Sequence, residues 1–301
     1  MARGGAPWFV ADAARICAAA GEGTPSGGGW HGYRAGMLTT REECQVVDVV
    51  VLAGRRNEGP LKAVSDVAWE ALVPIAGKPM AAWVIEALKA SGVAERIVVV
   101  GPEELRVYLR PEDAVMEPSD DLIENVRRGA HAASRDHPLL VATSDIPMLT
   151  AGSVAAFVTA AKATPAEFHY PVVRKEDVER RFPGNRRTYV RLRDGTFTGG
   201  NIVLLDPRSA AKAIGVAEEL VAQRKKPWRL ALKVGTAFMI RLLLGRATVA
   251  EAEERFSRLF GVVSRAVPLP YAEIGVDVDH PGDVPFCEGE LRGRDKGASG
   301  G

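Results

Sequence analysis

Residues 46–80, VVDVVVLAGRRNEGPLKAVSDVAWEALVPIAGKPM, decide the fold of this chain. The stretch opens with an apolar run from Val46 to Leu52, which predicts a strand buried on both faces and therefore a parallel sheet. The strand must end at Ala53-Gly54, where the chain turns. A second glycine turn, at residues 74–79, places Pro79 at the first position of a helix with apolar residues at helical spacing.

Between the two turns lies a loop that combines small residues with cationic side chains: Gly54, Arg55, Arg56, Gly59 and Lys62. Backbone N–H groups exposed by glycine, together with nearby positive charge, are what a phosphate chain requires. The sequence therefore predicts a phosphate-binding loop directly after the first strand.

Composition excludes several classes of protein. The chain has 301 residues, 47% of them apolar, which is ample for a substantial core, and its net charge of +1 provides no overall field for nucleic acid or an anionic membrane. The three cysteines, Cys17, Cys44 and Cys287, are far apart and fit a reducing cytoplasm without disulfides. No stretch has the roughly 20 apolar residues of a transmembrane segment.

Further strands alternate with helices along the chain. Strand patterns occur at residues 96–100, 114–116, 139–143 and 167–173, with helical patterns between them. This alternation predicts an α/β fold with a parallel sheet and right-handed crossovers. Residues 188–205 then show alternating runs around the Asp194-Gly195 turn, which predicts an antiparallel insertion.

Acidic residues follow two of the predicted strands. Asp145 stands just past the strand at 139–143, at the edge where open α/β sheets bind ligands, and its carboxylate is suited to Mg²⁺. The alternative role for Asp145 is a turn or a helix cap. Near the other end of the chain, alternation over residues 273–284 predicts a last strand with Asp277 and Asp279 on one face.

Two polar groups of residues lie in or near the antiparallel insertion. At its turn, glycines allow close approach to a ligand while Thr198 and Asn201 offer polar groups; a tight turn without a ligand is the alternative. Before it stands a basic cluster that suits a phosphate, although a solvated charged face also explains it: Arg180, Arg181, Arg186, Arg187, Arg191 and Arg193.

Taken in order, these segments resemble the nucleotidyltransferase superfamily, in particular the branch similar to molybdenum-cofactor guanylyltransferases. The family pattern is approximately LAGGxxxRx, a variable spacer, PKxLxPxxGxPM, then xxxDxPxL and a closing DxDxPxDL. The resemblance implies a Rossmann-like three-layer sandwich that binds a nucleoside triphosphate and a small, phosphorylated acceptor. It places Leu52, Ala53, Gly54 and Asn125 at the nucleotide, and Thr198, Gly200 and Asn201 at the acceptor. Asp145 and Asp279, with Asp277 in reserve, would hold Mg²⁺.

The chain departs from the family pattern at two positions. Arg55 stands where the family has the second glycine, and Glu70 stands where it has a phosphate-neutralising lysine. Lys62, Arg55 or Arg56 is then the alternative source of that charge. The departures leave two hypotheses open: an NTP transferase that uses these catalytic residues with Asp145, or a regulatory module that binds the same ligands without turnover.

The sequence also predicts the limits of the domains. We expect a disordered extension at 1–44, the nucleotidyltransferase core at 45–206, a helical insertion at 207–265, a closing strand and helix of the core at 266–286, and a disordered tail at 287–301. A basic run at residues 224–229 is followed by a largely apolar segment up to residue 246, which fits either peripheral membrane contact or packing on the sheet or on a homodimer partner.

Overall fold

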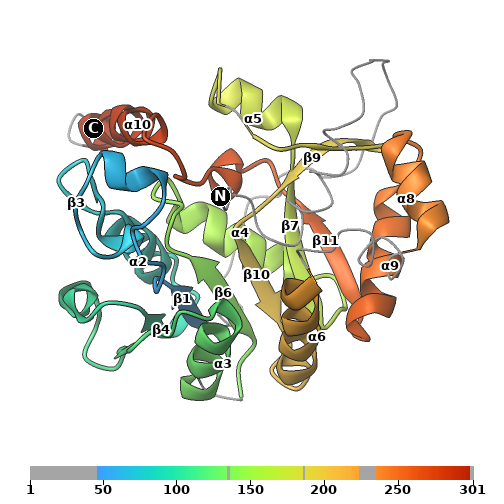
Figure 1. Ribbon diagram of the computed structural model, residues 1–301, viewed down its shortest axis with the longest axis horizontal. Coiled ribbons are helices and arrows are strands. Elements are labelled where there is room, and N and C mark those ends of the chain that lie inside the picture. Colours follow the sequence, from blue (N-terminus) through green and yellow to red (C-terminus); the bar gives the residue numbers. More distant parts are fainter. Residues whose placement is uncertain (1–45, 134–135, 186, 224–234, 299–301) are drawn as a thin grey trace, which may run out of the picture.

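The computed structural model describes residues 46–133, 136–185, 187–223 and 235–298 (Figure 1). Its centre is a sheet of nine strands within those ranges, in the order β5-β4-β1-β6-β10-β7-β9-β8, with β11 also paired to β7. The strands are β1 Val47–Leu52, β4 Ala94–Val100, β5 Ala114–Met116, β6 Leu139–Thr143, β7 Phe168–Arg174, β8 Val190–Leu192, β9 Gly195–Gly199, β10 Ile202–Leu205 and β11 Ser264–Pro268. A small separate hairpin pairs β2 Pro74–Ile75 with β3 Lys78–Pro79.

Strand β1 lies between two parallel neighbours, as its apolar run predicts. It pairs with β4 on one side and β6 on the other, and Val49, Val50 and Val51 are all 0% exposed. Because both faces of the strand are covered, alternation is absent from its sequence. Because β1 and β6 are parallel, the loop that begins at Gly54 starts at the same edge of the sheet as the carboxyl end of β6.

Most strand pairs in the second half of the sheet are antiparallel. Strand β10 runs antiparallel to both β6 and β7, and β9 joins β7 to β8 by antiparallel pairing. The predicted antiparallel insertion is therefore confirmed, and with it the expected α/β fold with a mixed sheet. The insertion brings the turn between β9 and β10 beside the end of β6.

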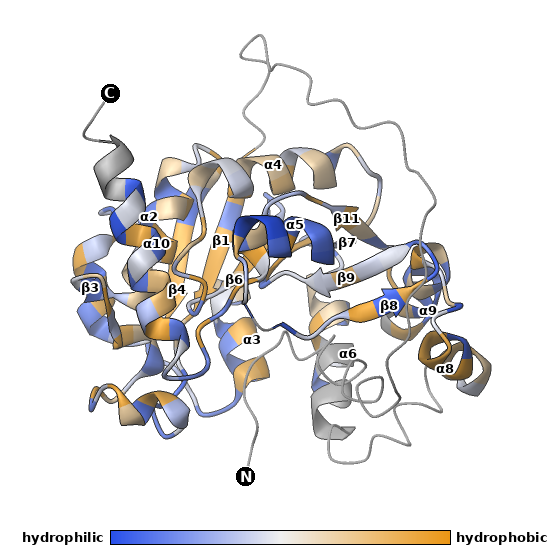
Figure 2. Ribbon diagram, turned by 90° about the horizontal axis from the view of Figure 1, so that it is seen from above, coloured by the Kyte–Doolittle hydropathy of each residue, from blue (hydrophilic) through white to orange (hydrophobic). Residues whose placement is uncertain are grey.

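Helices cover both faces of the sheet, so that the fold has three layers (Figure 2). On one face α2 Met80–Ala90 and α4 Ala151–Lys162 pack in a core that contains Val49 and Val51. On the other face α3 Leu122–Ala132 and α6 Ala210–Gln223 pack in a core that contains Val50. The remaining helices are α5 Lys175–Arg181, α8 Thr236–Leu243, α9 Val249–Phe260 and α10 Asp283–Ala298, with 3₁₀ turns η1 Pro60–Ala63, η2 Glu70–Leu72, η3 Glu103–Tyr108 and η4 Ala272–Gly275.

Helix α3 packs unusually close to β1. Asp121 caps its first turn by accepting a hydrogen bond from the Glu124 amide at 2.9 Å. Farther along the helix, a β-carbon at Gly129 would lie 2.4 Å from Cγ1 of Val50, so only glycine fits there. This close approach fixes the height of α3 over the sheet.

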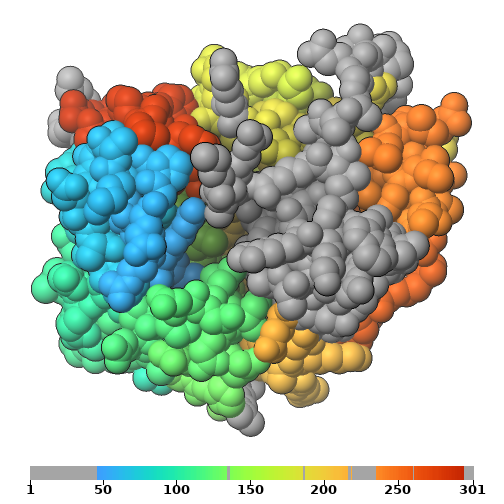
Figure 3. Space-filling view, in the orientation of Figure 1, coloured from blue at the N-terminus to red at the C-terminus, as the bar shows by residue number. Residues whose placement is uncertain are grey.

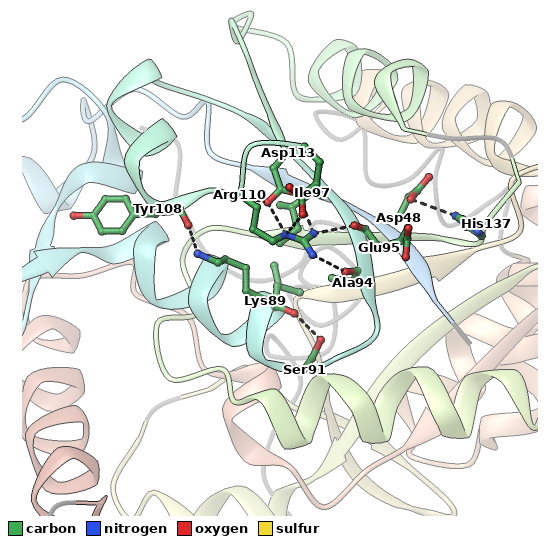
Figure 4. Close-up of polar contacts among 12 residues, drawn as sticks. Asp48, Lys89, Ser91, Ala94, Glu95, Ile97, Tyr108, Arg110, Asp113 and His137 are labelled. Carbon is green, nitrogen blue, oxygen red and sulfur yellow. Dashed lines mark hydrogen bonds and ion pairs between the residues drawn. The ribbon is translucent and has the colours of Figure 1, made fainter. Parts of the chain in front are cut away.

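A buried polar network closes the β4–β5 edge (Figure 4). The Arg110 guanidinium donates to both carboxylate oxygens of Asp113, and the Ile97 amide donates to Asp113 Oδ1 at 2.8 Å. Burial alone would raise the pKa of Asp113, but these hydrogen bonds outweigh it and hold the pKa below its ordinary value. The charge of Asp113 is therefore balanced by Arg110 within the fold, and this network lies outside the candidate site.

Helix α10 corrects the expectation of a disordered tail from residue 287. The helix continues to Ala298 and buries Cys287 and Leu291 in a core with Ile75 and Met80. Glu288 also accepts a hydrogen bond from the Ala76 amide at 3.0 Å. The helix thus lies directly against the segment around the small hairpin (Figure 3). Composition predicted disorder because charged residues and glycines dominate residues 288–301.

The segment after residue 272 is also different from its predicted form. Residues 272–275 form η4, and residues 276–279 belong to no strand, although their alternation is typical of one. The strand that closes the sheet is instead β11, which pairs in parallel with β7. It begins at Ser264, at the end of the segment expected to be a helical insertion.

Some expectations fall outside the described residues. The predicted extension at 1–44 lies there entirely, and so do residues 224–234 of the segment considered for membrane contact. Within the described ranges, none of the helices has the length and apolar character needed to cross a membrane.

Candidate active site

Three carboxylates from remote parts of the chain converge at the carboxyl end of β6. One oxygen of each of Asp145, Asp277 and Asp279 lies within 4.8 Å of the others. The two segments are joined by a hydrogen bond from the Val278 amide to the Asp145 carbonyl at 2.8 Å. The structure thus brings together the acids that the sequence singled out, and we call them the acid triad.

The acid triad concentrates negative charge in a small volume, and the pKa values of two of its carboxyl groups are raised. Burial raises the pKa of Asp145, whose carboxylate accepts a hydrogen bond from the Thr143 hydroxyl. Burial, followed by the negative charge of Asp145, raises the pKa of Asp279 to about 6. Like charges at this separation favour protonation or a bound cation, so the site has the character of a cation-binding centre.

The loop after β1 places one of its three candidate cations at the triad. Arg55 NH1 lies 3.7 Å from Asp279 Oδ1, and its side chain is 51% exposed. Arg56 instead stacks on Trp69, with its guanidinium carbon 3.9 Å from the ring centroid. Lys62 is exposed on η1, and no contact among the described residues connects it with the triad. Geometry therefore selects Arg55.

The predicted nucleotide residues lie around the turn at the end of β1. Leu52 ends the strand and Ala53 is buried. A β-carbon at Gly54 would lie 2.4 Å from Pro118 Cβ, on the loop before α3, and 3.0 Å from Asn125 Nδ2, on α3 itself. Asn125 accepts from the Ser119 amide and donates to the Ser119 carbonyl, at 2.7 and 2.8 Å. The observed bonds of Asn125 therefore shape the loop that faces Gly54.

The predicted acceptor residues border the triad through their backbone. Asn201 accepts a hydrogen bond from the Thr143 amide at 3.0 Å and donates its own amide to the Ile274 carbonyl at 2.9 Å. Thr198 is buried on the same turn, and Gly200 donates to the Pro171 carbonyl at 2.9 Å. Within the described part of the chain, the buried side-chain nitrogen of Asn201 has no partner. A donor left this way is suited to a ligand oxygen.

Comparison with known proteins identifies the family of this chain. Residues 49–233 match the MobA-like NTP transferase domain. The chain belongs to this family. It is also similar, with 43% sequence identity and a TM-score of 0.71, to a solved hypothetical transferase from Thermus thermophilus, over 79% of this chain and 99% of that one.

More distant structures share the fold of this NTP transferase. A CMP:2-keto-3-deoxy-manno-octonic acid synthetase complexed with CTP is 13% identical, with a TM-score of 0.53, over 83% of this chain and 99% of that one. A 4-diphosphocytidyl-2C-methyl-D-erythritol synthase from Anaerococcus prevotii is 7% identical, with a TM-score of 0.50, over 83% and 97%. Among curated protein sequences, none matches the chain.

Two charged residues of this NTP transferase lie at the acid triad although the sequence did not predict them as site residues. Arg187 forms an ion pair with Asp277, and their side chains are only 6% and 5% exposed. Glu70 is also buried, and its pKa is raised to about 7, first by burial and then, against the opposing charge of Arg55, by Asp145 and Asp279. The basic cluster contained Arg187, but nothing in the sequence distinguished it from its neighbours.

The other described arginines of the basic cluster have different surroundings. Arg180 pairs with Asp177 and Arg181 with Glu290 of α10, each at 2.8 Å. Arg191 and Arg193 flank the hairpin turn on and after β8, and Arg186 lies outside the described residues. Within the described ranges, Arg187 is the member whose observed ion pair joins it to the triad.

Proposed function

We propose that this NTP transferase moves a nucleoside monophosphate from a triphosphate to a small, phosphorylated acceptor and releases pyrophosphate. The observation that carries the proposal is the convergence of Asp145, Asp277 and Asp279, within 4.8 Å of one another, beside the half-exposed Arg55. This arrangement stands at the carboxyl edge of the sheet, where α/β folds bind ligands.

The triad fits a divalent cation. Its donors are carboxylate oxygens from two separate segments, the hard ligands that Mg²⁺ takes together with phosphate oxygens and water. Asp145 and Asp279 are the principal candidates for ligands, and Asp277 is the third, although it is also held by Arg187. When bound, Mg²⁺ would supply charge stabilisation on the transferring phosphate.

The remaining work falls to residues of the chain that bind and orient. An oxygen of the acceptor phosphate attacks the α-phosphorus in line, a new P–O bond forms, and the bond to the β-phosphate breaks as pyrophosphate leaves with the electron pair. Because a phosphate oxygen is already ionised near neutral pH, the reaction needs no general base. Arg55 neutralises triphosphate charge, and the turn at Thr198, Gly200 and Asn201 orients the acceptor.

The test is pyrophosphate release from pairs of substrates. The protein would be incubated with MgCl₂, one of CTP, GTP, UTP, ATP or dTTP, and one of a panel of sugar phosphates and alcohol phosphates. We expect release that requires both substrates and the metal. Triphosphate binding without release for every pair would contradict the proposal and favour the regulatory module.

A further inference from the structure

The two positions at which this chain departs from its family pattern are partners in the structure. Arg55 stands in place of the second glycine of the pattern and Glu70 in place of its lysine. The Arg55 Nε atom lies 3.1 Å from Glu70 Oε2, and the Glu70 amide donates to the Arg55 carbonyl at 3.0 Å. Both the side chains and the backbones of the two residues are therefore joined.

The pair has an inner and an outer member. The Glu70 side chain is 7% exposed, whereas that of Arg55 is 51% exposed and reaches toward Asp279. With Nε on Glu70, the two terminal guanidinium nitrogens point away from that carboxylate; NH1 lies 3.7 Å from Asp279 Oδ1, beyond hydrogen-bond distance, and both nitrogens can bind phosphate oxygens. The buried carboxylate of Glu70 thus holds the half-exposed guanidinium of Arg55, which faces the acid triad.

The loop around the pair is held in place independently of it. Asn57 is buried and donates from Nδ2 to the carbonyls of Ser65 and Val67, at 2.8 and 3.0 Å. A β-carbon at Gly59 would lie 3.1 Å from Glu70 Oε1, so glycine leaves the room that the carboxylate fills. The position of Glu70 is consequently set by the folded loop, and Arg55 is held against a fixed point.

We infer that Glu70 is a positioning residue that holds Arg55 over the triphosphate site, and that the Arg55–Glu70 pair performs the task of the lysine in the family pattern. The positive charge therefore stands at position 55 where the family pattern has it at position 70, and the carboxylate at position 70 orients the guanidinium. The inference rests on the proposed function, because it concerns the same triphosphate.

A double-mutant cycle on triphosphate affinity tests this arrangement. Calorimetry would measure how tightly the protein binds each triphosphate of the panel in the presence of Mg²⁺. The dissociation constants would be compared for wild type, Arg55→Gly, Glu70→Gln and the double variant. We expect Arg55→Gly to weaken binding by about 10- to 100-fold, as for loss of a hydrogen bond to a charged group. Glu70→Gln should weaken it by several-fold, because the guanidinium loses its fixed point.

The sign of the Glu70→Gln effect separates positioning from simple charge. In the Arg55→Gly background Glu70 has no guanidinium to orient, so Glu70→Gln should leave triphosphate binding unchanged or tighten it there, while it weakens binding in wild type. Tighter binding in both backgrounds would mean that Glu70 acts only through its charge and would overturn the inference. Thermal unfolding of each variant confirms that it is folded.

The double variant Arg55→Gly/Glu70→Lys restores the family arrangement. It should recover most of the triphosphate affinity that Arg55→Gly loses. The matched control is the same exchange at an exposed ion pair outside the site, Arg106→Gly with Glu103→Lys. It should leave the triphosphate affinity at the wild-type value. Failure of the restored arrangement to bind better than Arg55→Gly would overturn the exchange of roles. A wild-type protein that binds none of the triphosphates would contradict the proposed function itself, and the inference would fall with it.

Discussion

The backbone of Val278 donates a hydrogen bond to the carbonyl of Asp145 at 2.8 Å, and this contact brings together the two distant segments that carry the acid triad. Asp277 and Asp279 flank Val278, which is itself 1% exposed. The contact depends on main-chain atoms and a buried apolar anchor. The arrangement of the triad should therefore survive changes to its carboxylates.

Replacing Asp145 with Asn should abolish Mg²⁺-dependent pyrophosphate release without unfolding the protein. The amide oxygen can still accept from Thr143, and burial, which raises the pKa of Asp145, makes a neutral group easier to accommodate. We expect a loss of rate of about 100-fold or more, since even outer-shell partners of a metal contribute up to that. The melting temperature should be unchanged or higher.

Glu104→Gln, at an exposed carboxylate on η3, is the control for Asp145→Asn and should retain wild-type rates. Full activity of the Asp145 variant would refute its assigned role. A large fall in its melting temperature would instead show that the carboxylate is needed for the fold.

Gly129→Ala should destabilise the protein by overpacking. Its new methyl group would lie 2.4 Å from Val50 Cγ1 in a fully buried contact between α3 and β1, which typically costs about 1–3 kcal/mol. Val50→Ala removes the opposing methyl groups, so the double variant should lose less free energy of unfolding than the two single variants together. Urea denaturation measures all three. Strictly additive losses would contradict the close contact.

The parts of the fold that the sequence predicts are those with local causes. The apolar run of β1 and the placement of Asp145 after β6 both follow from neighbours in the sequence. The α10 helix does not, because its stability comes from docking Cys287 and Leu291 against residues near position 75.

The same distinction applies within the site. Alternation of Asp277 and Asp279 with valines predicts their shared side correctly, but it cannot reveal that the segment lacks strand partners in the sheet. The ion pairs of Arg55 with Glu70 and of Arg187 with Asp277 arise only when positions that are distant in the sequence meet in the folded chain. A sequence shows the charges, and the tertiary fold decides which of them meet.

Glu70→Gln should change how the stability of the protein depends on pH. Burial raises the pKa of Glu70 from 4.5 to about 7 in the folded state, so the folded protein favours the protonated carboxyl. This contribution to stability is fully present below pH 4.5 and is lost as the pH rises through 7.

In metal-free buffer, Glu70→Gln should therefore gain melting temperature relative to wild type between pH 5 and pH 8, with the larger difference at pH 8, above the folded-state pKa of about 7. Glu104→Gln again serves as the control and should parallel wild type. A constant difference across this interval would contradict the raised pKa of Glu70.

Arg187→Gln should make the stability of the protein more dependent on Mg²⁺. Arg187 and Asp277 are almost fully buried, and removal of one member of such a pair typically costs about 3–5 kcal/mol, because the other charge stays buried. The variant should melt earlier in metal-free buffer. Mg²⁺ should raise its melting temperature more than that of wild type, because the guanidinium no longer competes for Asp277 and binding to the native state stabilises it.

The matched control for Arg187→Gln is Arg180→Gln, which removes an arginine from an exposed ion pair with Asp177. It should follow wild type at every Mg²⁺ concentration, since an exposed pair contributes little. Equal Mg²⁺-induced shifts in wild type and Arg187→Gln would show that Arg187 and the cation do not share Asp277. In that case the cation would be held by Asp145 and Asp279 alone.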